Sequence, residues 1–210
     1  MYLSRIELDL TKNATRRALS SPQVLHAAVE NCFNDRVDKN RKLWRLDRLN
    51  GKLYLLMVSP KKPDFMAFAK QFAPAQDGGE SRDYLSYINR AQKDKCFNFR
   101  LKANPVHNVR DESGERGKVY AHVTVEQKKD WLFKKAPNYG FSLDPDGFDL
   151  VETDQLKFFR NKESRPVLID TAVFEGRLKV TEPDIFIQAL TQGIGRAKAY
   201  GCGLLTIAGI

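Results

Sequence analysis

Two alternating apolar stretches joined at Asn50-Gly51 constrain the fold of this chain more than any other feature. Residues 43–49 and 52–59 both have strand-like patterns. An Asn-Gly pair between such stretches is the strongest short-range signal for a β-hairpin, because both residues tolerate the positive φ of a type I′ turn. A lone hairpin is barely stable in water and needs further strands or a helix against its apolar face. The sequence therefore predicts a sheet built around this hairpin.

A strand and a helix precede the hairpin. Residues 2–10 alternate as a strand, and residues 11–17 form a polar connector. A helix then begins with Ser21 as N-cap and Pro22 at its first position, which are the residue types preferred there. The buried stripe expected for this helix recurs at helical spacing and consists of Leu25, Ala28, Val29, Cys32 and Phe33.

A second helix and a fourth strand follow the hairpin. The helix begins after Pro63-Asp64, residues 74–80 form a loop, and residues 82–94 have no clear period. Residues 96–103 alternate as a strand. The order strand-helix-strand-strand-helix-strand is the ferredoxin-like unit. We therefore expect residues 1–105 to form one ferredoxin-like domain.

The same order of elements recurs in residues 106–210. The elements expected there are a polar loop at 106–117, a strand at 119–125, a helix at 126–135, strands at 148–159 and 166–174, a helix capped by Thr181, and a closing strand at 204–208. The sequence thus predicts an α+β protein of two tandem ferredoxin-like, RRM-like domains with antiparallel sheets. With no long linker between them, the domains should pack together and leave a cleft.

The charge balance points to a polyanionic partner. The 210 residues include 35 Lys and Arg against 26 Asp and Glu, a net charge of +9. Such an excess favours nucleic acid first and a membrane surface second, while a merely basic soluble protein is the alternative. No apolar run approaches the roughly 18 residues of a membrane span. Three widely spaced cysteines suggest neither zinc nor disulfides, so we expect a cytoplasmic protein without metal or cofactor.

A glycine-rich stretch near the C-terminus is the clearest candidate binding loop. Its glycines are Gly193, Gly195, Gly201 and Gly203, and Arg196 and Lys198 lie between them. Glycine lets backbone amides approach a ligand, and successive amides can bind an anion such as phosphate. A purely structural turn is the alternative. The stretch lacks the Walker pattern, so NTP hydrolysis is not expected.

This stretch, G-x-G-x-x-K-x-x-G-x-G-L-L, resembles the C-terminal motif of the Cas6-type CRISPR RNA-processing endoribonucleases. The resemblance is strongest to their Cas6e branch and covers all 210 residues. It continues through the segments Met1-Tyr2-Leu3-Ser4, Phe99-Arg100-Leu101-Lys102-Ala103-Asn104-Pro105 and Phe174-Glu175-Gly176. It implies the same two-domain fold, a CRISPR repeat RNA stem-loop as substrate, and the other subunits of a type I-E Cascade complex as partners.

The resemblance also implies a catalytic histidine. Taken alone, His26 in the first helix is more often structural than catalytic, although Gln23 and Glu30 make its face polar. In the Cas6e branch a histidine at this position is catalytic. The implied reaction is metal-independent: a 2′-hydroxyl attacks the adjacent phosphate and leaves a 2′,3′-cyclic phosphate. An imidazole could serve as base or as acid, and both roles stay open.

The chain departs from some relatives around this histidine. Certain Cas6e enzymes have a tyrosine three residues before it and a lysine five residues after it, where this chain has Gln23 and Asn31. Neither can replace a phenol or an ammonium group. Other cations are then the candidates to compensate, namely Arg16, Arg17 and Lys198.

Several basic residues are candidate RNA contacts. Arg160, Lys162 and Arg165 form a basic turn between two strands; the resemblance implies that such a hairpin enters the major groove of the RNA stem, and a solvated hairpin tip is the alternative. Arg100 and Lys102 lie on the open face of their strand and could hold phosphates. Two rival functions remain, a non-catalytic RNA-hairpin-binding module and an assembly subunit that mainly contacts protein.

Overall fold

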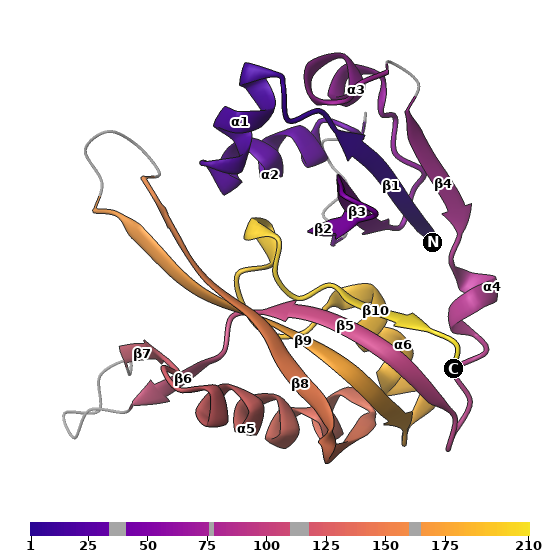
Figure 1. Cartoon of the computed structure of the whole chain (residues 1–210). Helices are drawn as coiled ribbons and strands as arrows, with labels where there is room; N and C mark the ends of the chain where they lie inside the picture. Colours follow the sequence, from indigo (N-terminus) through magenta and orange to yellow (C-terminus); the bar gives the residue numbers. More distant parts are fainter. Residues whose placement is uncertain (34–40, 76–77, 110–117, 160–164) are drawn as a thin grey trace.

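The Asn50-Gly51 hairpin lies in the first of two four-stranded antiparallel sheets (Figure 1). This computed structural model describes residues 1–33, 41–75, 78–109, 118–159 and 165–210. Strand β2 (Leu43–Leu49) pairs with β3 (Lys52–Ser59). Asn50 and Gly51 have φ of 51° and 77°, as a type I′ turn requires. The predicted hairpin is therefore confirmed.

Two further strands complete this sheet, in the order β2-β3-β1-β4. Both β1 (Tyr2–Leu8) and β4 (Gly79–Asp83) pair antiparallel, and β4 begins inside the stretch predicted as a loop at 74–80. Polar residues dominate β4, and three of its five positions are exposed. An edge strand of this kind has no apolar pattern for a sequence prediction to detect.

Three helices cover one face of this sheet (Figure 1). They are α1 (Asn13–Leu19), α2 (Pro22–Glu30) and α3 (Met66–Phe72). The predictions of α2 and α3 are confirmed, but the expected polar connector at 11–17 is wrong, since most of it belongs to α1. That helix buries only Thr15 and Ala18, so its helical period is barely visible.

The second sheet has the order β10-β5-β9-β8. Its strands are β5 (Cys96–Ala103), β8 (Phe141–Phe158), β9 (Val167–Val180) and β10 (Leu205–Ala208), with helices α5 (Val125–Lys135) and α6 (Pro183–Gln192) between them along the chain. If the four strands of each sheet are numbered 1 to 4 along the chain, the second sheet has the spatial order 4-1-3-2. The first sheet has the same order when it is followed from β4 to β2. Two ferredoxin-like domains with antiparallel sheets are therefore confirmed.

The prediction that the strand at 96–103 is the fourth strand of the first sheet is wrong. It forms as predicted, but β5 pairs with β9 and β10, and β4 takes the fourth place in the first sheet. Alternation shows which face of a strand is buried but not which strand lies beside it. We therefore propose a domain boundary within residues 84–95, which include the short helix α4 (Leu85–Ile88), in place of one near residue 105.

Several boundaries in the second half also differ from the prediction. The strand predicted at 119–125 ends early, as β7 (Lys118–Ala121), and pairs with β6 (Val106–Val109) in a separate ribbon. Strand β8 begins seven residues before the predicted position, because it passes through a bulge at residues 144–147 that reads as a loop. The N-cap of α6 is Glu182, one residue after the predicted Thr181. No helix among the described residues is long and apolar enough to cross a membrane.

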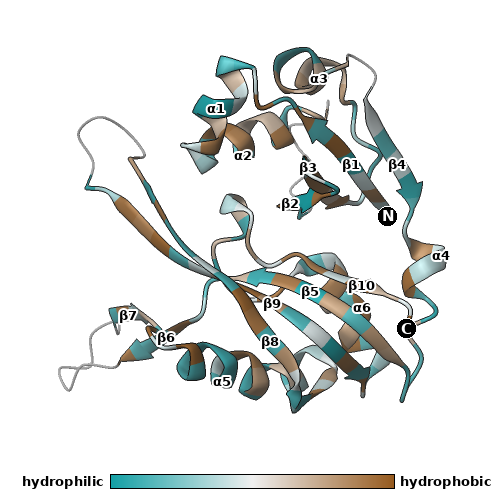
Figure 2. Ribbon diagram, viewed as in Figure 1, coloured by the Kyte–Doolittle hydropathy of each residue, from teal (hydrophilic) through white to brown (hydrophobic). Residues whose placement is uncertain are grey.

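The apolar residues form two cores, and the second of them joins the domains. The first core lies between the first sheet and its helices. The second contains Leu43 and Val58 from the first sheet together with Leu101, Phe174 and many other residues of the second domain. Figure 2 shows the alternation of hydrophobic and hydrophilic residues along β5 and β8 that makes one face apolar. The first sheet is therefore covered on both faces, by its own helices and by the second domain.

A buried arginine fixes the two domains to each other. Arg45 on β2 is 1% exposed. Its guanidinium donates two hydrogen bonds to Asp47, at 2.8 and 2.7 Å, and others to the Arg100 carbonyl, the Leu204 carbonyl and the Thr206 hydroxyl at 2.8–2.9 Å. A buried charge is tolerated only when paired and fully hydrogen-bonded. This network fixes the position of β2 relative to β5 and β10 of the other sheet.

Candidate functional site

The helix that carries His26 faces the arm formed by β8 and β9. His26 is half-buried on α2. Gln23, one turn earlier, donates from Nε2 to the carbonyl of Phe159 at 3.0 Å, directly after β8 ends. Figure 1 shows β8 and β9 extending beyond their sheet toward α2. The side of α2 that carries Gln23 and His26 therefore lies beside the far end of this arm, where β8 ends.

The other end of this face is held by an ion pair. Glu30, the last residue of α2, accepts a bond from Lys42 Nζ at 3.0 Å, and the Lys42 side chain is 4% exposed. The face around His26 is thus polar at both ends, as the sequence predicts. His26 is half-buried and is not part of the first apolar core, to which its neighbours Leu25 and Val29 belong.

The glycine-rich stretch forms a turn that packs against α2. It contains the short helix η2 (Lys198–Tyr200), which contacts both α2 and β2. Gly201 has φ of 81°, and a Cβ there would lie 2.9 Å from the Trp44 ring. At Gly203, with φ of 89°, a Cβ would lie 2.8 Å from the Ile194 carbonyl oxygen. Glycine is required at both positions, because the backbone there is left-handed and a Cβ would come too close to neighbouring atoms.

Three backbone N–H groups of this loop, which the sequence predicts to bind phosphate, already donate hydrogen bonds to other groups of the protein. The N–H of Gly193 bonds to the Ala189 carbonyl at 2.9 Å and that of Gly203 to the Lys102 carbonyl at 2.7 Å. The N–H of Gly195 bonds to the Tyr139 hydroxyl at 3.2 Å. The charge of the loop, carried by Arg196 and Lys198, is therefore its more available means of holding an anion.

Lys198 is the cation in the part of the loop that contacts the histidine helix. It is half-buried at the start of η2. Burial, followed by the positive charge of nearby Arg41, lowers the pKa of its ammonium group. Two like charges in a partly desolvated place favour an anion between them. No sequence pattern singled out Arg41, because only the fold brings it to Lys198.

The two strand residues predicted to hold phosphates have different surroundings. Arg100 is paired with Glu175 and, through Nε, with Asp47 Oδ1 at 3.3 Å, so two carboxylates already neutralise it at the domain interface. Lys102 is half-buried and lines a small cavity of about 40 Å³ between the domains, together with Leu25 of α2 and Tyr200 of η2. The structure therefore brings Lys102, and not Arg100, toward the histidine helix.

The remaining predicted residues fall into two groups. Arg165 is exposed at the start of the returning strand, while Arg160 and Lys162 lie outside the described residues. Of the cations considered as compensation, Arg16 donates to the carbonyls of Leu10 and Thr11 and to Asn13, so its guanidinium is engaged locally. Arg17 is exposed on α1.

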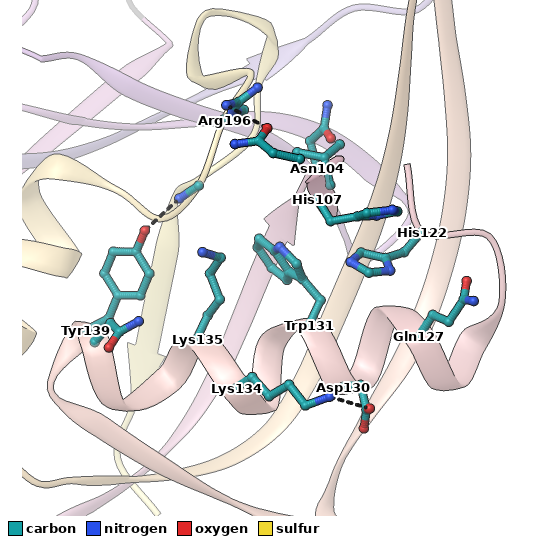
Figure 3. Close-up of a pocket in the computed structure, with 14 residues that line it drawn as sticks. Asn104, His107, His122, Gln127, Asp130, Trp131, Lys134, Lys135, Tyr139 and Arg196 are labelled. Atoms are coloured by element: carbon teal, nitrogen blue, oxygen red, sulfur yellow. Dashed lines mark hydrogen bonds and ion pairs between the residues drawn. The ribbon is translucent and has the colours of Figure 1, made fainter. Parts of the chain in front are cut away.

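A second, larger pocket lies in the second domain. Its volume is about 770 Å³, and α5, the β6-β7 ribbon and the start of the glycine-rich stretch enclose it (Figure 3). His107 and His122 line it, with ring centroids 4.7 Å apart. No sequence pattern gives either histidine a role.

The fold and the site define a tandem ferredoxin-like protein whose histidine helix faces basic groups of its second domain. A family model described as CRISPR associated protein matches residues 1–209, and the chain belongs to this family. The predicted resemblance to the Cas6e branch is confirmed by relatives within it.

Two curated relatives and two solved structures are informative. The chain is 26% identical to the CRISPR-associated endoribonuclease Cse3 of Thermus thermophilus, over 99% of this chain and 100% of that protein. It is 31% identical to the CRISPR system Cascade subunit CasE of Escherichia coli, over 52% of this chain and 56% of that one. A structure of CRISPR endoribonuclease Cse3 bound to 19 nt RNA matches with a TM-score of 0.85 at 25% identity, over 99% and 100% of the two chains. Cas6e from E. coli matches in fold, with a TM-score of 0.64 at 20% identity over both full lengths.

Proposed function

We propose that this chain is a CRISPR RNA-processing endoribonuclease that cuts repeat RNA at the base of its stem-loop and then stays bound as a subunit of a type I-E Cascade complex in the cytoplasm. The observation that carries the proposal is the full-length match, in sequence and fold, to Cse3, a named endoribonuclease with an RNA-bound structure. The partial match to the Cascade subunit CasE supports the assembly role.

His26 is the proposed catalytic residue. The 2′-hydroxyl oxygen forms a bond to the adjacent phosphorus, the bond from phosphorus to the 5′-oxygen breaks, and the products carry a 2′,3′-cyclic phosphate and a 5′-hydroxyl. One proton must leave the 2′-hydroxyl and one must reach the leaving oxygen. An imidazole on the polar face of α2 can carry out either transfer, which is worth about 10²–10⁴-fold. Lys198 and Arg41 supply positive charge for the phosphorane.

The test is a cleavage assay with repeat RNA in EDTA. The wild-type protein should cut in EDTA and leave a cyclic phosphate. His26→Ala should lower the single-turnover rate by about 10²-fold or more while binding the RNA as tightly as before. A 2′-deoxy substitution at the scissile nucleotide should block cutting and spare binding. Undiminished cutting by His26→Ala would remove this site, and a requirement for Mg²⁺ would remove the mechanism.

A non-catalytic RNA-hairpin-binding module is the second candidate, and one observation favours it. Gln23 takes the place of a tyrosine found in some Cas6e enzymes, and its amide is bound to the Phe159 carbonyl instead of projecting freely beside His26. This function predicts tight, salt-sensitive binding of the hairpin with no cleaved product at any pH. The same assay separates the two, because only an enzyme yields the cyclic phosphate.

A further inference from the structure

Two buried polar groups without a hydrogen-bond partner line the same pocket. Trp131 on α5 is 6% exposed and Asn104, directly after β5, is 9% exposed. Within the described part of the chain, Trp131 Nε1 and Asn104 Oδ1 are two of four buried side-chain atoms that have no hydrogen-bond partner. Each such group costs about 1–3 kcal/mol when left unpaired. One unpaired donor and one unpaired acceptor thus belong to residues that line a single pocket, and a ligand there that reached both atoms would satisfy them.

The pocket has the size and walls of a small-ligand site. Its volume of about 770 Å³ is within the range of about 300–1,000 Å³ seen for such sites. In Figure 3, Trp131 and Lys135 rise from α5 into the same space that His107 and His122 enter from the β6-β7 side. The two imidazole rings, with centroids 4.7 Å apart and planes 39° from parallel, give one side of the pocket an aromatic surface.

The charge of the lining suits an anionic group. Its cations are Lys134, Lys135 and Arg196, and its carboxylate, Asp130, is paired with Lys134 at 3.1 Å. Arg196 also donates to Asn108 Oδ1 at 3.3 Å, which holds its guanidinium at the rim. Burial, followed by the charges of His107 and Lys134, lowers the pKa of His122, which favours the neutral form of the ring, the form suited to contact a base.

We propose that this pocket binds one unpaired nucleotide of the RNA, extruded from the strand. The Trp131 N–H donates to the base edge, Asn104 Oδ1 accepts from it, and the histidine rings lie against the base. Lys135 and Arg196 hold the adjoining phosphate. The edge of every RNA base offers both an acceptor and a donor, and unpaired bases are what proteins recognise in this way.

Continuity with the histidine helix favours RNA over other occupants. Gly195 and Arg196 line the pocket, and the same stretch continues at once into η2, which packs against α2. The pocket and the helix of His26 therefore lie at the two ends of one basic loop that an RNA strand can follow. The inference rests on the proposed function, because it takes the nucleotide from the RNA that this chain binds.

The test combines changes in the protein with changes in the RNA. The probes are a repeat hairpin alone, the hairpin with a short unpaired extension at either end, and extended hairpins with an abasic residue at each unpaired position in turn. For the wild type, one abasic position should weaken binding about tenfold or more. Trp131→Phe, which removes the N–H and keeps an apolar ring, should weaken binding of the extended RNA roughly two- to tenfold. It should have no further effect on the RNA that is abasic at that position.

Controls separate this inference from folding and from the proposed function. Lys135→Ala provides a second variant if Trp131→Phe lowers the melting temperature of the protein. Lys93→Ala is the matched control, because Lys93 is an exposed lysine between α4 and β5. All variants should bind the hairpin alone like the wild type. The measured quantity is the affinity for the extended hairpin divided by the affinity for the plain hairpin. The inference is overturned if this ratio is the same in the wild type, Trp131→Phe and Lys135→Ala. Failure of the wild type to bind any hairpin would instead overturn the proposed function.

Discussion

Asn31 ends α2 with an exposed, uncharged side chain, five residues after His26. Because some Cas6e enzymes have a lysine at this place, we expect Asn31→Lys to raise the single-turnover cleavage rate by about tenfold, through added charge near the phosphorane. A lysine at a helix C-terminus should also stabilise the helix by about 0.3–1 kcal/mol. Ser20→Lys is the matched control, since Ser20 is the exposed C-cap of α1. Equal acceleration by both variants would show a general effect of charge.

Gly203 supports the loop through its backbone conformation. Gly203→Ala would place a Cβ 2.8 Å from the Ile194 carbonyl oxygen and 3.0 Å from Lys198 Cγ, at φ of 89°. We expect it to lower the free energy of unfolding by about 2–4 kcal/mol and to weaken RNA binding by displacing Lys198. Gly51→Ala is the control, since Gly51 has φ of 77° and open space around its Cα; about 1 kcal/mol should be lost there. Urea unfolding measures both, and equal losses would remove the packing argument.

At the scale of elements, the arm formed by β8 and β9 corresponds to the hairpin that is predicted to enter the major groove of the RNA stem. The Gln23 bond to the Phe159 carbonyl places the far end of this arm beside the histidine helix. If the basic turn contacts RNA phosphates, a variant with Arg160, Lys162 and Arg165 all changed to Ala should lower the slope of log affinity against log salt by about 2–3 units. Titrations of hairpin RNA at several salt concentrations provide the measurement.

The matched control for the arm removes charge elsewhere. Lys62, Lys93 and Lys95 are exposed residues outside the arm, and changing all three to Ala removes the same formal charge. This variant should keep the wild-type slope. A comparable fall in both variants would mean that the hairpin contributes only to the general positive field of the protein.

At the scale of the whole molecule, one buried carboxylate joins the two domains. Asp47 is 5% exposed and accepts from Arg45, while Arg100 lies 3.3 Å away. Asp47→Asn would leave two guanidinium groups at the interface without this charge, and the free energy of unfolding should fall by about 3–5 kcal/mol. Asp94→Asn, which breaks the exposed pair with Lys179 at 2.7 Å, should cost at most about 1 kcal/mol. Denaturant unfolding of both variants tests this, and similar costs would contradict a structural role for the network.

The local elements and the family could be determined from the sequence alone. The turn at Asn50-Gly51, the start of α2 at Pro22 and the alternation of residues 96–103 depend on backbone preferences and side-chain periods that neighbouring residues encode directly. The C-terminal glycine motif carried the family resemblance. The order of elements was enough for the fold class, because two ferredoxin-like units require little more than that order.

Only the tertiary structure decided which elements and side chains meet. Strand β5 joins the second sheet because its partners are the distant β9 and β10, a choice that no local pattern encodes. Helix α1 and strand β4 bury too few apolar residues to show a period. The neutralisation of Arg100, the approach of Arg41 to Lys198, and the unpaired donor of Trp131 near the unpaired acceptor of Asn104 all arise between segments far apart in the chain. Charge and hydrogen bonding depend on distance in space, and packing alone sets those distances.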